Sequence, residues 1–243
     1  MVVLGAAGNA SADTVIFDDM EHGDPFANGW FAFPGDVGGG GLGPNSTDLP
    51  PVNGGNFSIE TGWGSGGTPG FLGGFGRTNP SDLTGMTHFN FWINPDVVDA
   101  QGRPQDYVLE INLQEDDNNN NVFDNNPFQE GPDDEWQFNC AVNGSDDACV
   151  KVGGGWQLIS ISLADFFDDN VVFPGGNDTF DPFAIGGDGQ LINIVFAVVS
   201  NSGADVTFRT DYWHFTSVPE PASLALLGLG LAGLGFARRR RRQ

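Results

Sequence analysis

The chain has 243 residues, with 9 lysines and arginines against 32 aspartates and glutamates, and a formal net charge of −23. Five arginines are consecutive, from Arg238 to Arg242, so residues 1–217 keep 4 basic and 31 acidic residues and a formal charge of −27. A body with this charge repels nucleic acid and anionic membrane surfaces, and it suits solubility and the binding of divalent cations. Its length is sufficient for one sizeable hydrophobic core in a single domain.

The first twelve residues have the composition of the second half of a secretory signal peptide. A short apolar stretch ends at Ala10-Ser11-Ala12, which fits an A-x-A cleavage pattern, although no basic segment precedes it. We interpret Met1 as a start site placed too far downstream. The expected mature body is therefore the exported segment 13–217.

Short apolar or alternating segments, separated by Gly, Asn and Asp turns, predict an all-β fold built as an antiparallel β-sandwich. The expected strands cover residues 14–21, 56–63, 86–93, 107–114, 135–142, 156–163, 191–199 and 205–215. Glycine-rich connections are expected at 22–55 and 64–76, and a single helical turn at 163–168. No alternation of strands with helices is present to predict a parallel sheet.

The segment Tyr107–Gln114 alternates most regularly of all. Its apolar residues share one face by the two-residue period of a strand. The opposite face carries Glu110, Asn112 and Gln114. Gln137 and Asn139 extend this polar face if 135–142 is the neighbouring strand. These amide and carboxylate groups are suited to hydrogen-bond the hydroxyls of a glycan.

A glycan site also needs an aromatic platform for the apolar faces of the sugars. We include Trp136 in the predicted ligand-binding set as this platform. Trp63 and Trp92 are the other candidates. The alternative, for each of these side chains, is ordinary packing in the core.

The segment after Gln114 is rich in oxygen ligands. Five positions follow the alternating arrangement of a calcium loop: Asp116, Asn118, Asn120, Val122 through its carbonyl, and Asp124. The loop departs from the EF-hand pattern because Asn121 replaces the turn glycine and Pro127 stands at the twelfth position, with Glu130 close by. The alternative is a metal-free Asn/Asp turn, since asparagine tolerates the left-handed conformation.

The two cysteines, Cys140 and Cys149, are expected to form a disulfide in an exported protein, with two free thiols as the alternative. The three histidines, His22, His88 and His214, lie far apart and match no catalytic metal spacing. We therefore expect a protein that is not an enzyme. A glycoside hydrolase stays open as an alternative, because 31 acidic residues allow many carboxylate pairs.

The C-terminal 26 residues have three parts in a fixed order. The turn Pro219-Glu220-Pro221 comes first, the uncharged segment Ala222–Ala237 second, and the arginines last. Sixteen residues at about 1.5 Å each give a helix of roughly 24 Å, a marginal span for a bilayer core of about 30 Å. The arginines would keep the extreme C-terminus in the cytoplasm.

This tail resembles the PEP-CTERM sorting signal of Gram-negative bacteria that make exopolysaccharide. The resemblance implies that Pro219, Glu220 and Pro221 are read by an exosortase, which removes the tail during export. The chain would then be held briefly in the inner membrane and would end at the cell surface or in the extracellular matrix. The alternatives are a plain membrane anchor and a small-residue helix dimer built on Gly228, Gly230, Gly233 and Gly235.

Short motifs in the body also resemble a family. The segments Phe17–Glu21, Asp82–Ile93, Gly155–Phe166 and Thr210–Trp213 look like parts of the galactose-binding-type jelly-roll sandwiches found in many carbohydrate-binding modules. The resemblance implies a jelly-roll fold, which hosts many functions.

The same resemblance implies a second ion position, where the acids after the first strand meet the last strand. In this sequence the residues are Asp19, Glu21 and Asp211, with solvated carboxylates as the alternative. Together these features lead us to expect a calcium-stabilised, non-catalytic surface or matrix protein that binds exopolysaccharide. A structural surface protein without a specific ligand is the alternative.

Overall fold

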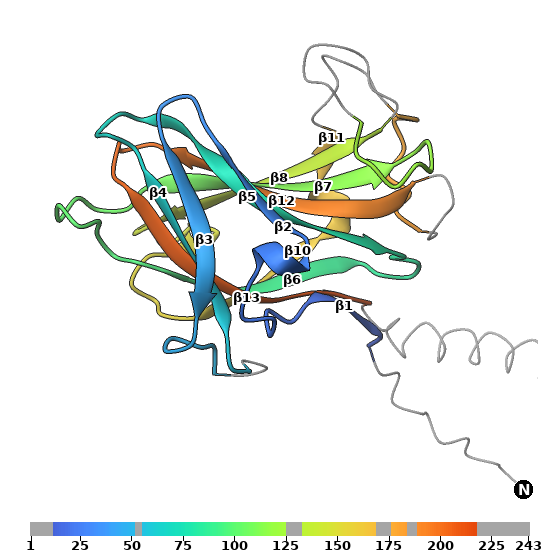
Figure 1. Cartoon of the computed structure of the whole chain (residues 1–243), viewed down its shortest axis with the longest axis horizontal. Helices are drawn as coiled ribbons and strands as arrows, with labels where there is room; N and C mark the ends of the chain where they lie inside the picture. The colour runs from blue at the N-terminus through green and yellow to red at the C-terminus, as the bar shows by residue number, and fades with distance from the viewer. Residues whose placement is uncertain (1–11, 52–54, 125–132, 169–175, 184–188, 218–243) are drawn as a thin grey trace, which may run out of the picture.

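The computed structural model describes residues 12–51, 55–124, 133–168, 176–183 and 189–217. The expected signal-peptide remnant up to residue 11 and the sorting tail, with Pro219, Glu220 and Pro221, lie outside the described residues. No helix within the described ranges is long and apolar enough to cross a membrane. The described body confirms the predicted all-β sandwich, and it consists of two sheets (Figure 1).

The first sheet has the strand order β10-β6-β13-β4-β3, and β1 also pairs with β13. Its strands are β1 (Thr14–Asp18), β3 (Gly39–Asn45), β4 (Ser58–Gly64), β6 (His88–Pro95), β10 (Gln157–Ser162) and β13 (Val206–Thr216). All of these pairs are antiparallel. Strand β13 is bonded to β6 on one side and to β4 and then β1 on the other.

The second sheet has the order β11-β8-β7-β12-β5-β2, and the short β9 runs parallel to β8. Its strands are β2 (Trp30–Pro34), β5 (Gly70–Ser81), β7 (Tyr107–Asp116), β8 (Glu135–Asn143), β9 (Val150–Lys151), β11 (Phe167–Asp168) and β12 (Gln190–Ser200). The described helical segments are two 3-10 turns, η1 (Phe26–Asn28) and η2 (Leu163–Asp165). The second of these lies within the helical turn predicted at 163–168.

An aromatic core joins the two sheets. Phe196 of β12 stacks on Trp213 of β13 with ring centroids 4.4 Å apart, and Phe75 of β5 packs against both rings. All three side chains are fully buried, and each such burial stabilises the fold by about 1.5–3 kcal/mol. The apolar residues of β7 also face this core, as the alternation predicted.

The expected connections 22–55 and 64–76 were wrong in part, because they contain β2, β3 and most of β5. Their glycines allow other groups to approach the backbone closely. A Cβ atom at Gly76 would lie 2.6 Å from the carbonyl oxygen of Ile194 and 2.8 Å from the ring of Phe31. Glycine is therefore compatible with a central strand here, because the space of its missing side chain is already filled.

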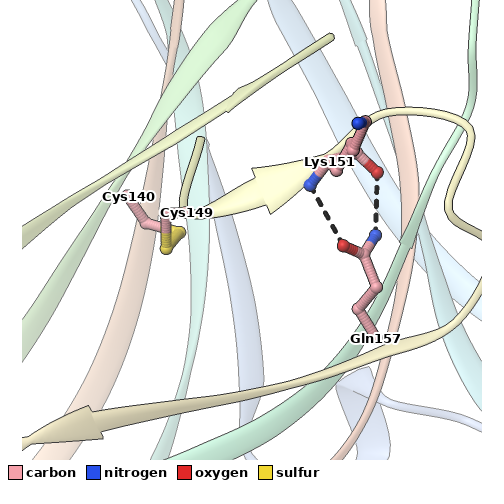
Figure 2. Close-up of a disulfide and its surroundings, with 4 residues drawn as sticks. All are labelled: Cys140, Cys149, Lys151 and Gln157. Carbon is pink, nitrogen blue, oxygen red and sulfur yellow. Dashed lines mark hydrogen bonds between the residues drawn. A yellow bond between two sulfur atoms is a disulfide. The ribbon is translucent and has the colours of Figure 1, made fainter. Parts of the chain in front are cut away.

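Cys140 of β8 and Cys149 form the predicted disulfide, with Cα atoms 5.2 Å apart (Figure 2). The bond fixes β9 beside β8. Lys151 of β9 donates its backbone N–H to Gln157 Oε1 at 3.1 Å, and Gln157 Nε2 donates to the Lys151 carbonyl at 2.8 Å (Figure 2). Since Gln157 begins β10, this edge of the second sheet is tied to the first sheet.

Candidate functional site

A cavity of about 830 Å³ lies over the face of β7, β8, β12 and β5 that points away from the core. Seven of its polar lining residues come from these four strands: Thr78, Glu110, Asn112, Gln114, Glu135, Gln137 and Asn193. The structure therefore brings together three of the residues predicted for ligand binding, namely Glu110, Asn112 and Gln114. Gln137 joins them because it pairs with Asn112 in the sheet.

Hydrogen bonds between side chains connect these polar groups across the sheet. Thr78 Oγ1 donates to Asn193 Oδ1 at 2.7 Å, and Asn193 Nδ2 donates to Gln114 Oε1 at 2.9 Å. Gln114 Nε2 in turn donates to the Glu135 carboxylate. The cavity floor thus has amide groups held in fixed orientations, which reduces the entropy lost when they bind a ligand.

Aromatic rings form an apolar wall of the cavity. Phe31 and Phe33 project from β2 and Phe71 from β5, and all three are half-buried. Their ring centroids are 6.4 Å apart between Phe31 and Phe33 and 6.3 Å apart between Phe33 and Phe71. Sequence reasoning missed these residues because it placed them in connections. The apolar run Trp30-Phe31-Ala32-Phe33 was the available signal.

The tryptophans considered as platforms lie elsewhere. Trp136 follows Glu135 in β8, so it points to the opposite face, where its indole N–H donates to Glu115 at 2.8 Å and its ring contacts Phe180. Trp63 is buried in the core at 1% exposure. Trp92 lies on β6 of the other sheet. None of the three lines the cavity, so the predicted set of Glu110, Asn112, Gln114 and Trp136 does not share one site.

The predicted calcium loop follows β7 and closes one end of the cavity, which Asn121, Val122 and Phe123 help to line. Asp116 accepts the backbone N–H groups of Asn120 at 3.0 Å and Asn121 at 2.6 Å. Residues of this loop therefore form part of the cavity wall.

The predicted ligands of this loop converge only in part. Asn118 and Asn120 both donate side-chain N–H groups to Asp124 Oδ2, so these three side chains meet. Asp116 instead faces the Gln190 amide at 2.9 Å, and the side chain of Val122 is 54% exposed. Rotation of the two asparagine amides by 180° would turn their oxygens toward a cation. Asp133, which sequence reasoning did not include, bonds the backbone N–H of Asp124 at 2.6 Å.

Buried carboxyl groups lie beneath the loop, and their negative charges are close together. Burial and the nearby Asp117 raise the pKa of Glu115 to about 9. Burial, Asp134 and Asp181 raise the pKa of Asp117 to about 7. Burial also raises the pKa of Asp133, despite hydrogen bonds that act in the other direction. A divalent cation near these groups would favour their ionised forms.

The second predicted ion position lies at the junction of β1 and β13. Asp211 is fully buried, and among the residues that the structure describes only the adjacent backbone N–H of Tyr212 reaches its oxygens as a donor. Burial raises the pKa of Asp211 to about 8; the Tyr212 N–H opposes this, and Glu21 and Asp19 add to it. A cation could therefore be accepted by the predicted residues Asp19, Glu21 and Asp211.

The same junction of β1 and β13 has unusual backbone geometry and further groups that could bind a cation. Met20 and Tyr212 have φ values of 61° and 49°, which non-glycine residues seldom adopt. Asp18, Asp19 and His22 also offer ligand atoms within 4.8 Å of one another. The Asp18 carboxylate, however, is already bonded to Arg77 and to the Trp30 indole N–H at 3.0 Å. Asp18 is therefore a structural ion-pair partner.

The body has the architecture of the β-sandwich carbohydrate-binding modules. It superimposes on the family 11 module of the cellulosomal cellulase Lic26A-Cel5E of Clostridium thermocellum with a TM-score of 0.55 and 15% identity, over 87% of this chain and 99% of that one. The family 11 module from the same organism in complex with a β-1,3-1,4-mixed-linked tetrasaccharide gives 0.54 and 16%, over 86% and 98%. At 15% and 16% identity, this similarity shows that the fold is shared and nothing more.

Three further comparisons give the following results. An exo-β-agarase structure matches with a TM-score of 0.50 and 10% identity, over 86% of this chain and 25% of that one. No curated protein matches the chain. Residues 217–242 match the PEP-CTERM protein-sorting motif. The predicted sorting tail is therefore confirmed, and the chain is an exported, exosortase-processed protein of the cell surface.

Proposed function

We propose that this protein binds the polysaccharide produced by its own cell, at the surface or in the extracellular matrix, and does not cleave it. The observation that supports this proposal is the cavity on the second sheet, with its ordered amide floor and phenylalanine wall. Sugar rings have apolar faces that stack on aromatic rings and hydroxyl edges that bond amides and carboxylates. The export signal would bring the cavity to the location of the polysaccharide.

The carboxylates of the cavity are poorly placed for glycoside hydrolysis. Glu110 pairs with Asn139, and Glu135 pairs with Gln114 four residues further along β7. Their backbones are therefore roughly 13 Å apart along the strand. Hydrolases hold their two carboxyl groups at about 5–5.5 Å or 6.5–9.5 Å. This spacing favours binding without cleavage, and an assay for released reducing ends tests the hydrolase alternative.

Calcium is the cation that we propose for the two acidic positions, because it takes six to eight oxygen ligands in flexible geometry. In the loop, Asn118, Asn120 and Asp124 would hold it, with Asp116 and the Val122 carbonyl completing the set. At the strand junction, Asp19, Glu21 and Asp211 would hold it. Bound calcium would neutralise carboxylates that otherwise repel one another.

The test of glycan binding is co-sedimentation of recombinant residues 13–217 with exopolysaccharide from the producing organism. We expect saturable retention by the wild type. Phe31→Ala combined with Phe33→Ala should weaken it at least about tenfold, because each stacked ring contributes about 1 kcal/mol or more. Asn112→Ala should also weaken it, by removing one polar group from the floor.

Phe26→Ala is the matched control, since this ring is 55% exposed on η1 and does not line the cavity. It should leave retention unchanged. Equal retention by the wild type and the double phenylalanine variant, with both folded, would remove the cavity from the proposal. No retention by the wild type would favour a structural surface protein without a specific ligand.

Calcium is tested by thermal unfolding and co-sedimentation in excess Ca²⁺ and in chelator. Saturating calcium should stabilise the fold by about 2.7 kcal/mol at one hundred times the dissociation constant. Asp124→Asn should remove the calcium dependence of glycan retention, because the loop lines the cavity. Asp211→Asn should reduce the thermal stabilisation and leave retention calcium-dependent, because β13 belongs to the other sheet.

Asp165→Asn, at an exposed position of η2, serves as the control for the loss of one negative charge. It should respond to calcium as the wild type does. Absence of both binding heat and thermal stabilisation when Ca²⁺ is added to the wild type would contradict the calcium proposal and leave glycan binding to be judged separately.

A further inference from the structure

The charge of the cavity lining is entirely negative. Among its described lining residues are two carboxylates, Glu110 and Glu135, four amides on the floor and one threonine hydroxyl, but no lysine or arginine. A ligand that enters therefore meets negative charge in a partly enclosed space, where electrostatic interactions are stronger than in open water.

The basic residues of the body are all engaged elsewhere. Residues 12–217 contain four of them, and each forms an ion pair outside the cavity: Arg77 with Asp18, Arg103 with Asp99 and Asp205, Lys151 with Asp146, and Arg209 with Asp48, Glu60 and Asp96. The Arg209 guanidinium alone contacts three carboxylates, at 2.7 Å for Asp96 and 2.9 Å for Glu60. Apart from the calcium ion proposed for the loop, a positive charge at the cavity must therefore come from the ligand.

We propose that the cavity selects a polysaccharide that carries free amino groups, such as a glucosamine-type chain. This inference rests on the proposed glycan-binding function and names the class of glycan. Protonated sugar amines would lie beside the Glu110 and Glu135 carboxylates, and the sugar rings would stack on the wall of Phe31, Phe33 and Phe71.

The spacing of the two carboxylates suits a polymer. Glu110 and Glu135 are separated along the strand direction by the row that holds Asn112 and Gln137. Their backbone positions are roughly 13 Å apart along the strand, which exceeds one sugar ring, so different residues of one chain running along β7 would meet the two side chains. The amides between them would bond the hydroxyls of the intervening sugar.

Other glycan classes fit the charge less well. A uronic acid polymer would bring further carboxylates to a cavity and a body that are already strongly negative. An N-acetylated amino sugar has the same ring and no charge, so it would keep the stacking and the hydrogen bonds only. The expected order of affinity is free amine, then neutral sugar, then uronic acid.

The experiment compares a matched pair of ligands, the glucosamine tetramer and the N-acetylglucosamine tetramer, by calorimetry with the full-length chain in a non-ionic detergent. The buffer is mildly acidic and of physiological ionic strength, so that the amines are protonated and distant charges are screened. We expect the free-amine tetramer to bind at least about tenfold more tightly. A galacturonic acid tetramer is the third ligand and should bind most weakly.

Glu110→Gln combined with Glu135→Gln should abolish the preference for the free-amine tetramer, because it removes both negative charges of the cavity and keeps the size of the side chains. The matched control is Asp13→Asn combined with Asp165→Asn, which removes two carboxylates at exposed positions distant from the cavity lining and should keep the preference. An equal loss of preference in both double variants would show that the net charge of the protein is responsible, and would overturn the inference.

Equal or tighter binding of the N-acetylated or galacturonic acid tetramer also overturns the inference, while the proposed glycan-binding function stands. If no tetramer binds, the inference is wrong, and co-sedimentation with the producer's own polysaccharide decides the proposed function separately. Retention there that depends on Phe31 and Phe33 would preserve glycan binding with another class of sugar.

Discussion

The pKa of Glu115 lies far above that of an ordinary glutamate. This residue lies at the end of β7 on the core side, fully buried, and it accepts hydrogen bonds from the Trp136 indole at 2.8 Å and from the backbone N–H of Asp181 at 3.0 Å. Burial and neighbouring carboxylates raise its pKa to about 9, from an ordinary value of 4.5. At neutral pH and without a cation, this side chain is therefore a neutral acid.

A stability profile against pH follows from this pKa. The folded protein keeps a proton on Glu115 that the unfolded chain releases above pH 4.5, so the stabilisation is full below that pH and is lost as the pH rises toward 9. Glu115→Gln should remove this contribution, which reaches up to about 1.4 kcal/mol per pH unit. Urea unfolding in chelator at several values between pH 5 and pH 8 measures the slope.

Asp165→Asn again controls for the loss of one carboxylate, and its slope should match that of the wild type. If Glu115→Gln unfolds with the pH dependence of the wild type, Glu115 is ionised in the folded protein. A cation or another donor must then be sought beside it.

At the scale of the element, the glycines of β5 allow neighbouring groups to pack closely against this strand. This strand lies between β12 and β2, and Phe31 of β2 covers Gly76. We expect Gly76→Ala to destabilise the protein by about 1–3 kcal/mol, because the new methyl group would overlap the Ile194 carbonyl and the Phe31 ring. The free energy of unfolding measures this effect, and glycan retention should fall with it as the ring is displaced.

Gly62→Ala is the matched comparison within β4, because a Cβ atom there meets nothing within 4 Å. It should be neutral, or stabilising by a few tenths of a kcal/mol through the lower entropy of the unfolded chain. If both alanine variants have the same stability, the close approach at Gly76 is relaxed in solution and the wall of the cavity is not set by this glycine.

The same glycines explain where sequence reasoning succeeded and where it did not. Strands such as β7 and β12 were predictable because their own side chains alternate or are apolar throughout. Strands β3 and β5 were not, since glycine and proline are rare in strands unless a neighbour fills the space. Strand β2 was placed in a connection although its apolar residues were visible in the sequence. Glu110, Asn112 and Gln114 were therefore found for the cavity floor, whereas the wall of Phe31, Phe33 and Phe71 was missed.

Trp136 shows a second limit of predicting the site from the sequence. It lies on a strand that carries part of the polar face, but successive residues of a strand point to opposite faces. Glu135 and Gln137 line the cavity, and Trp136 between them therefore turns toward Glu115. The alternation was visible in the sequence, while the partner that holds the indole was not.

At the scale of the whole molecule, charge repulsion should dominate the effect of salt. Residues 1–217 carry a formal charge of −27, and the four basic side chains are already paired. Added sodium chloride screens the excess of carboxylates more than it weakens a few ion pairs. We expect the unfolding temperature in chelator to rise by several degrees from low salt to about 0.5 M. A decrease would show that the ion pairs outweigh the repulsion.

Strand β13 gives the fold a mechanical property. The sorting tail follows Ser217, directly after this strand, so that any pull on the tail is applied to β13. The strand is bonded on both sides, by β6 and by β4 and β1 in turn, and Trp213 anchors it in the core. Pulling β13 out of the first sheet along its own direction therefore requires many hydrogen bonds to break together. A protein held at its C-terminus would therefore carry tension without unravelling.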